Sequence, residues 1–190
     1  FDLNGGGWGG TPVGDGLDAT KGLMSNSRDC PIESLEMEYP LRMERYELLP
    51  DSAGAGKQRG GVGFYRVVRY LHGDGYFTNR SDGQKFAPEG VLGGYQGAKA
   101  RHKLIRADGT VIDMSSKVTN MDIHSGDLIH FETVGGGGYG NPAERAPEKV
   151  LDDVLDGLVS TEQAREIYRV AVDVEKGIIE DDATANLRAG

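Results

Sequence analysis

Residues 135–142 read GGGGYGNP and residues 147–154 read PEKVLDDV, and together they decide how this chain is organised. Adjacent glycines let a backbone turn and approach a neighbouring segment closely. Pro147 has the backbone angle of a first helical position. The sequence therefore predicts that a strand ends at the glycine run and that a helix begins soon after it.

The residues before the glycine run predict β-structure. Residues 32–49 come close to alternating polar and apolar side chains, interrupted at Pro40, and predict a strand. Aromatic and β-branched runs separated by turn residues predict three hairpins. The expected pairs are 62–71 with 76–79, 98–105 with 110–114, and 116–120 with 127–134.

The residues after Pro142 have a helical period. Apolar side chains recur at helical spacing from Val150 to Leu158. Ser160 is a favourable N-cap, with Gln163 three residues later, as in a capping box. A further helix is expected to begin at Asp181 or Asp182. The predicted fold class is α+β, a mainly antiparallel β domain with two or three C-terminal helices. The expected division is a glycine-rich β domain (1–140) and a helical C-terminal tail (141–190).

Composition excludes several classes of partner and site. The formal charge is −9, and acidic residues crowd the C-terminal quarter, a surface that repels nucleic acid and anionic membrane. Cys30 is the only cysteine, so neither an intrachain disulfide nor a four-thiolate zinc site can form. No run approaches the roughly 20 apolar residues that span a bilayer. We expect a cytoplasmic protein with no nucleic-acid or membrane partner.

Five phrases in order along the chain resemble the hydantoinase B / 5-oxoprolinase family. They are YPLRMERYEL (39–48), DSAGAGKQRGG (51–61), SKVT (116–119), the glycine run, and DGLVS (156–160). The resemblance implies the C-terminal portion of a B-type subunit. Such subunits are several hundred residues long, so a large N-terminal part is expected to be absent from this chain.

The resemblance also implies a chemistry. Family members are ATP-dependent amidohydrolases of cyclic amides, such as hydantoin, 5-oxoproline or a lactam, or ATP-dependent carboxylases of acetone or acetophenone. The implied partners are a hydantoinase A-like subunit that binds ATP and Mg, the remaining N-terminal B-type polypeptide, and a small-molecule substrate. Where members carry a catalytic divalent metal, its ligands are implied to lie in that N-terminal part. A non-catalytic assembly module is the alternative from another class.

Four side chains are candidates to face substrate or a partner. The phrase SNSRDCPIE (25–33) resembles the family's Asn-Thr-x-x-x-Pro-Ile-Glu phrase, which makes Asn26, Arg28 and Glu33 candidates. A satisfied turn network explains them equally well. Arg59 is followed by two glycines, which we expect to leave its guanidinium accessible to an anion. An ordinary surface arginine is the more common explanation.

The glycine run gives a second group of candidates. Gly136, Gly137, Gly138 and Tyr139 could present bare N–H groups to substrate or partner. Close backbone packing is the favoured alternative for these glycines.

The sequence assigns no catalytic residue, metal ligand or cofactor to this chain. The phrase GAGKQ (54–58) lacks the first glycine and the final Ser or Thr of a phosphate loop, so ATP is not expected to bind it. The four histidines lie apart on different predicted hairpins, with no metal-binding spacing.

Overall fold

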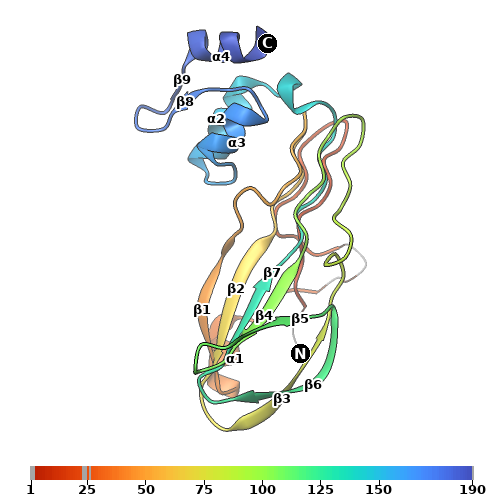
Figure 1. The fold of residues 1–190 in the computed structure, drawn as a ribbon, viewed down its shortest axis with the longest axis vertical. Helices are drawn as coiled ribbons and strands as arrows, with labels where there is room; N and C mark the ends of the chain where they lie inside the picture. The colour runs from red at the N-terminus through yellow and green to blue at the C-terminus, as the bar shows by residue number, and fades with distance from the viewer. Residues whose placement is uncertain (1–2, 23–24, 26, 190) are drawn as a thin grey trace.

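Five antiparallel strands form a sheet at one end of an elongated molecule (Figure 1). The structure is a computed structural model that describes residues 3–22, 25 and 27–189. Strands in the sheet follow the order β1-β2-β7-β4-β5. Their bounds are Leu41–Leu48 (β1), Phe64–Tyr70 (β2), Leu128–Glu132 (β7), Arg101–Ile105 (β4) and Val111–Met114 (β5).

A separate pair of strands covers one face of this sheet. β3 (Asp74–Arg80) and β6 (Lys117–His124) pair antiparallel with each other. Between the two layers lies a buried apolar cluster of Leu104, Met114, Ile123, Ile129 and Phe131. His102 lies on the same face of the sheet, 6 % exposed, with its ring 5.2 Å from that of Phe131.

Only one of the three predicted hairpins is confirmed. β4 pairs with β5, and Ile105 lies opposite Val111. The other two predictions are wrong, because β2 pairs with β1 and β7 whereas β3 pairs with β6. A turn signal says that the chain reverses but does not say which strand it then meets. β2 is largely buried and lies inside the sheet, so it needs partners on both edges.

The strand predicted over residues 32–49 begins too early. Residues Ile32–Glu38 form a helix, α1, and β1 begins only at Leu41. Leu35 is the residue of α1 that is buried, whereas Met37 is 87 % exposed, so the apparent alternation did not mark a buried face. Pro40 disfavours helical backbone at the residue before it, and the chain is extended at Tyr39.

Four glycine-rich segments run side by side in the middle of the molecule (Figure 1). They comprise residues 5–10, 52–63, 88–98 and 134–140, and we call them the glycine bundle. Backbone hydrogen bonds join them: the N–H of Gly136 donates to Gly61 (2.8 Å), and that of Gly54 donates to Gly136 (2.7 Å). The segments are thus held by peptide groups rather than by side chains.

The run 135–138 is the centre of this bundle. A Cβ added at Gly135 or Gly138 would overlap segment 52–55, one at Gly136 would overlap Trp8, and one at Gly137 would overlap Glu89. The segment that each glycine contacts therefore recurs every third residue, which is the period of an extended polyproline II-like helix. Only glycine lets three backbones approach a fourth so closely.

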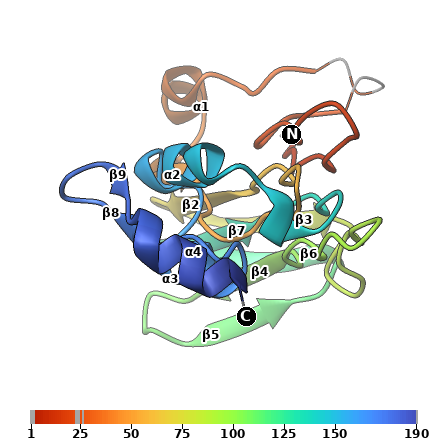
Figure 2. The same cartoon turned by 90° about the horizontal axis from the view of Figure 1, so that it is seen from above.

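The helical tail lies across the end of the bundle (Figures 1 and 2). It contains η1 (Pro142–Glu144), α2 (Pro147–Leu155), α3 (Thr161–Glu166), the short strands β8 (Val172–Asp173) and β9 (Ile178–Ile179), and α4 (Asp181–Ala189). The predicted cap is confirmed, since the Ser160 hydroxyl accepts a hydrogen bond from the Gln163 N–H (3.1 Å). The predicted fold class, mainly antiparallel β-structure with C-terminal helices, is confirmed as well.

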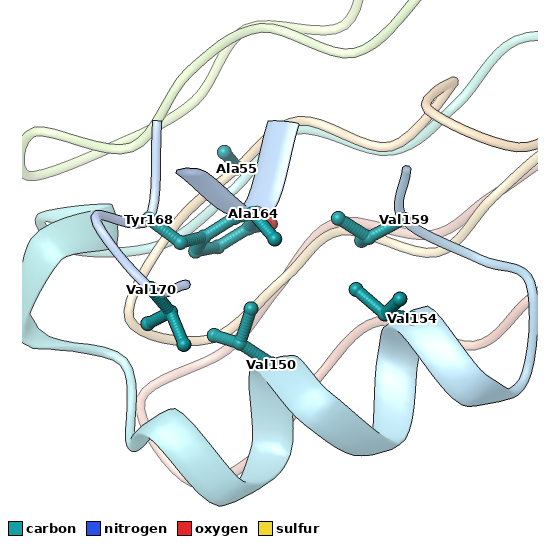
Figure 3. Close-up of a cluster of buried hydrophobic side chains, with 7 residues drawn as sticks. All are labelled: Ala55, Val150, Val154, Val159, Ala164, Tyr168 and Val170. Carbon is teal, nitrogen blue, oxygen red and sulfur yellow. The ribbon is translucent and has the colours of Figure 1, made fainter. Parts of the chain in front are cut away.

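A buried apolar cluster joins the tail to the bundle (Figure 3). Ala55 comes from the bundle, and the rest of the cluster comes from the tail: Val150, Val154, Val159, Ala164, Tyr168 and Val170. The N–H of Asp51 also donates to the carbonyl of Leu158 (3.0 Å). The division at residue 140 stays a prediction, and the two parts share this core.

Candidate functional site

The N-terminal loop encloses a cavity of about 320 Å³ beside the glycine bundle. Its walls are residues 3–8, residues 20–22, Ser25 and Val134. An antiparallel bridge between Gly6 and Thr20 closes the loop, and the Trp8 indole N–H donates to the carbonyl of Thr20 (3.0 Å). Gly5, Gly6 and Gly7 pack closely against Thr20, Val134 and Gly61, and Leu3, Trp8 and Val134 also line the space.

A cluster of charged and polar side chains lies next to this cavity. Lys21, whose chain lines the cavity, forms an ion pair with Asp29 (2.8 Å). The same carboxylate accepts a hydrogen bond from the Tyr46 hydroxyl (3.2 Å). The guanidinium of Arg66 lies over the Tyr46 ring, 5.2 Å from its centre, and donates to the Asn4 side chain (3.1 Å). Asp29 thereby ties the N-terminal loop to β1, and Arg66 ties it to β2.

The described residues around this cavity are glycines, apolar residues and a few polar ones. The described residues that line it include no His, Cys, Asp or Glu. Across residues 3–22, 25 and 27–189, no three His, Cys, Asp or Glu side chains lie close enough together to hold a metal ion. Glycine peptide groups and the amide of Asn4 are instead suited to hydrogen bonds with a small polar molecule or an extended segment.

A second charged cluster is buried at the junction of bundle and tail, and we call it the junction network. The Arg145 guanidinium contacts both oxygens of Asp15 (2.7 and 3.0 Å) and one oxygen of Asp153 (2.7 and 3.0 Å). Arg59 donates to the other oxygen of Asp153 (3.1 Å) and to Asp18 (2.9 Å). The network therefore links the N-terminal loop, the bundle and helix α2.

The electrostatics of the junction network favour an ionised Asp15, whereas burial raises the pKa of Asp153. Burial raises the pKa of Asp15, but hydrogen bonding and charge from Arg145 outweigh it, so the pKa lies below its ordinary value. Bidentate arginine–carboxylate pairs are among the strongest hydrogen-bonded pairs in proteins. The network thus holds three parts of the chain together, namely the N-terminal loop, the bundle and helix α2.

The expectation that Arg59 is accessible to an anion is wrong. Its residue surface is 4 % exposed, and its guanidinium is occupied by Asp18, Asp153 and the carbonyl of Gly60. The glycines beside Arg59 do not free it, because they let the bundle close around it. Those contacts leave no room for a substrate at this side chain.

The glycine candidates are also buried within the chain. Gly136, Gly137 and Gly138 lie inside the bundle, and the N–H groups of Gly136 and Gly138 donate to Gly61 and Tyr95. The expectation that these two N–H groups are bare is therefore wrong, and the alternative of close packing is confirmed for them. Tyr139 is partly exposed and exchanges backbone hydrogen bonds with Gln58.

The three candidates from the 25–33 phrase have different outcomes. Asn26 lies outside the described residues. Arg28 and Glu33 are exposed, Glu33 in the first turn of α1. Their role toward substrate or partner stays a prediction. The phrase does flank the cavity, since Ser25 lines it and Asp29 holds Lys21 beside it.

Sequence reasoning missed the residues that the fold brings together. Asn4, Lys21, Tyr46 and Arg66 are far apart in sequence, and none belongs to a recognisable spacing. For Asp15 and Asp18 the sequence did offer one signal, because two carboxylates stand inside a glycine-rich loop of low apolar content. Such carboxylates are often held by a cation elsewhere, but the sequence does not say which one.

Comparison with known proteins identifies the family. Residues 1–142 match the Hydantoinase B/oxoprolinase family. The chain belongs to the hydantoinase B/oxoprolinase family. The resemblance carried by the five phrases is thus confirmed, and the match spans the sheet, the glycine bundle and the N-terminal loop.

Two curated relatives are enzyme subunits that are much longer than this chain. The chain is 42 % identical over 174 residues to the B subunit of a putative D-/L-hydantoinase of Pseudomonas sp. (strain NS671), covering 90 % of this chain and 29 % of that protein. It is 29 % identical over 220 residues to the acetophenone carboxylase delta subunit of Aromatoleum aromaticum, covering 100 % of this chain and 32 % of the relative. The chain spans about a third or less of these relatives.

Solved structures share the fold. ATP-dependent caprolactamase from Pseudomonas jessenii matches with a TM-score of 0.76 and 31 % identity over 99 % of this chain and 33 % of that one. Nucleotide-free acetone carboxylase matches with a TM-score of 0.82 and 24 % identity, over 97 % of this chain and 29 % of that one. The second likeness concerns the fold alone.

None of the described helices is long and apolar enough to cross a membrane.

Proposed function

We propose that this chain is the C-terminal portion of the B-type subunit of an ATP-dependent amidohydrolase that opens a cyclic amide. The observation that carries this proposal is the 42 % identity to the B subunit of a putative D-/L-hydantoinase over 90 % of the chain. Likeness to caprolactamase at 31 % identity supports the same substrate class. The substrate would be hydantoin, 5-oxoproline or a lactam.

In this proposal the activating step takes place on partner polypeptides. A hydantoinase A-like subunit, working in the cytoplasm, transfers the terminal phosphoryl group of Mg-ATP to the amide oxygen and releases ADP. Water then adds to the activated carbon, the ring C–N bond breaks, and phosphate leaves. A catalytic divalent metal would be bound by the remaining N-terminal B-type polypeptide.

The contribution of this chain in the proposal is mainly structural. Arg59 and the central glycines make their contacts inside the molecule, so they hold this chain together rather than contact substrate. The cavity of the N-terminal loop, whose flanking segment carries Arg28 and Glu33, is the part through which this chain would face substrate or partner, and Asn26 stays a candidate from its place in the sequence.

A ketone carboxylase subunit is the second candidate. It is favoured by the acetophenone carboxylase delta subunit, which matches over the whole length of this chain. In that reaction an enol phosphate would meet activated bicarbonate instead of water. Both candidates place this chain in the same position within a larger subunit.

Reconstitution with the A-type subunit and the N-terminal B-type polypeptide tests the proposal. We expect ATP-dependent release of a ring-opened product from one of hydantoin, 5-oxoproline and caprolactam. Turnover of acetone or acetophenone that requires bicarbonate, without any ring opening, would replace the first candidate by the second.

A variant separates a catalytic role of this chain from an assembly role. Asn26→Ala is measured beside Arg28→Ala, the second candidate, with Arg165→Ala at an exposed position on α3 as the control. Loss of turnover with the complex intact assigns substrate contact to Asn26. Unchanged turnover in both candidate variants leaves this chain with assembly alone.

A further inference from the structure

The loop between β3 and β4 runs along the glycine bundle toward the helical tail and returns (Figure 1). Its turn lies at residues 91–94, where the N–H of Gly94 donates to the carbonyl of Val91 (3.0 Å). Both arms are fastened to the bundle: the N–H of Val91 donates to Gly138 (2.9 Å), and that of Tyr95 donates to Ala55 (2.7 Å). The turn is therefore presented rigidly rather than as a loose loop.

This turn exposes apolar side chains. Val91, Leu92 and Tyr95 are 51, 75 and 52 % exposed, and we call them the apolar tip. Phe86, on the ascending arm of the same loop, is 74 % exposed. Single exposed apolar residues are common on protein surfaces, but several gathered on one rigid turn mark a binding surface.

Leu92 adds an observation about backbone conformation. Its φ is +51°, in the left-handed region that a leucine rarely occupies. Glycine would adopt this angle without strain, yet the chain carries an exposed leucine there. Neither local conformation nor burial within this chain accounts for the leucine.

A groove lies next to the tip. It has a volume of about 190 Å³ and is lined by Ala53, Ala55, Tyr95, Ile167 and neighbouring polar residues. The tip supplies projecting side chains and the groove supplies a recess beside them. A surface with both features suits a stable interface that is complementary in shape.

We propose that the apolar tip and its groove are the docking surface for the remaining N-terminal part of the B-type polypeptide. This inference rests on the proposed function. The match to the hydantoinase relative covers 29 % of that protein, so more than two thirds of its length is tethered beside the matched region. Permanent interfaces are the more apolar class, and a tethered neighbour keeps the tip covered at all times.

Co-purification tests the proposal. The tagged chain is co-expressed with the N-terminal B-type polypeptide and the A-type subunit, and native mass spectrometry reports which chains remain bound. Leu92→Asp is expected to weaken capture of the N-terminal polypeptide at least about tenfold, with an unchanged melting temperature of the isolated chain. Val111→Asp, at an exposed position (55 %) on β5 at the other end of the molecule, is the control and is expected to bind normally.

Leu92→Gly separates an effect on binding from an effect on folding. It removes the side chain and relieves the backbone strain, so we expect equal or higher stability together with weaker capture. Normal capture by both Leu92 variants overturns the inference and leaves the proposed function standing. Selective loss of the A-type subunit also overturns it. Failure of the unmodified chain to capture any B-type polypeptide overturns the inference and the proposed function together.

Discussion

Two arginines carry the positive charge at the junction between bundle and tail. Arg145 and Arg59 are only 1 and 4 % exposed, yet each holds two carboxylates. Removing charges from water costs several kcal/mol per ion, and only close pairing offsets that cost. The junction network is therefore stabilising only while it is complete.

Truncating one arginine tests this dependence. Arg59→Ala leaves Asp153 with a single cation and Asp18 without its partner, and we expect a loss of about 3–5 kcal/mol in the free energy of unfolding. Urea denaturation of the 190-residue chain measures it. Arg28→Ala, at an exposed position, is the control and should change stability by less than about 0.5 kcal/mol. A loss below about 1 kcal/mol for Arg59→Ala would contradict the role assigned to the network.

His102 gives the chain a pH dependence. Both ring nitrogens are buried without a hydrogen-bond partner among the described residues, and burial, with a smaller contribution from His130, holds the pKa of His102 below its ordinary value of 6.5. Below about pH 6.5 the unfolded imidazole binds a proton that the folded one does not, so stability falls as pH falls.

The measurement is the free energy of unfolding between pH 7.5 and 5. We expect it to be level above about pH 7 and to decline below about 6.5, by up to about 1.4 kcal/mol per pH unit for one histidine. His102→Leu should remove from this slope of unfolding free energy against pH the contribution of the one proton that His102 binds on unfolding. The residual slope then belongs to His130, whose pKa burial also lowers. An equal slope in wild type and variant would show that His102 binds its proton in the folded state.

Among the elements, the glycine bundle tolerates substitution least. Gly136→Ala would place a methyl group against the Trp8 carbonyl and the Gly9 N–H, both parts of a fixed backbone. We expect a loss of at least about 3 kcal/mol or a chain that does not fold, the upper end of overpacking effects. Thermal unfolding by circular dichroism measures it.

Gly14 provides the matched control for that substitution. It lies in the N-terminal loop with open space around the position of a Cβ. Gly14→Ala should leave stability unchanged or raise it by under about 1 kcal/mol. If Gly136→Ala and Gly14→Ala unfolded at the same temperature, close packing of residues 135–138 would not be what limits substitution in the glycine bundle.

The elements that the sequence predicted correctly depend on local signals. The β4–β5 hairpin follows from its Asp108-Gly109 turn, and α3 follows from the cap at Ser160. The pairing of β2 with β7 and of β3 with β6 joins residues roughly sixty and forty positions apart, for which no local pattern exists. Alternation misled at α1 because Met37 and Tyr39, two apolar members of the alternating run, are 87 and 57 % exposed and mark no buried face.

Site prediction failed for the same physical reason. The sequence pointed to the 25–33 phrase, and the structure places its Ser25 and Asp29 beside the cavity, while the roles of its candidates stay predictions. It did not show that Arg59 would meet Asp18 and Asp153, which are supplied by segments 41 and 94 residues away. A residue's accessibility depends on such distant partners.

At the scale of the whole molecule, the tail and the bundle depend on each other. Ala55 lies in a cluster otherwise built by the tail, and Asp153 of the tail neutralises Arg59 of the bundle. Deleting residues 141–190 is therefore expected to lower the melting temperature of the β part by about 10 °C or more. Differential scanning calorimetry measures it. An unchanged melting temperature would show that residues 1–140 form an independent domain.

The central position of residues 135–138 also determines when the chain can fold during its synthesis on the ribosome. The surrounding segments at 5–10, 52–63 and 88–98 leave the ribosome first, and the segment that all of them require comes last. Until then the peptide groups that pair with residues 134–140 lack those partners, and closing these long loops is slow. A nascent chain stalled before residue 135 should therefore stay sensitive to protease along its entire β part, and a ribosome that has passed the glycine run should release a resistant one.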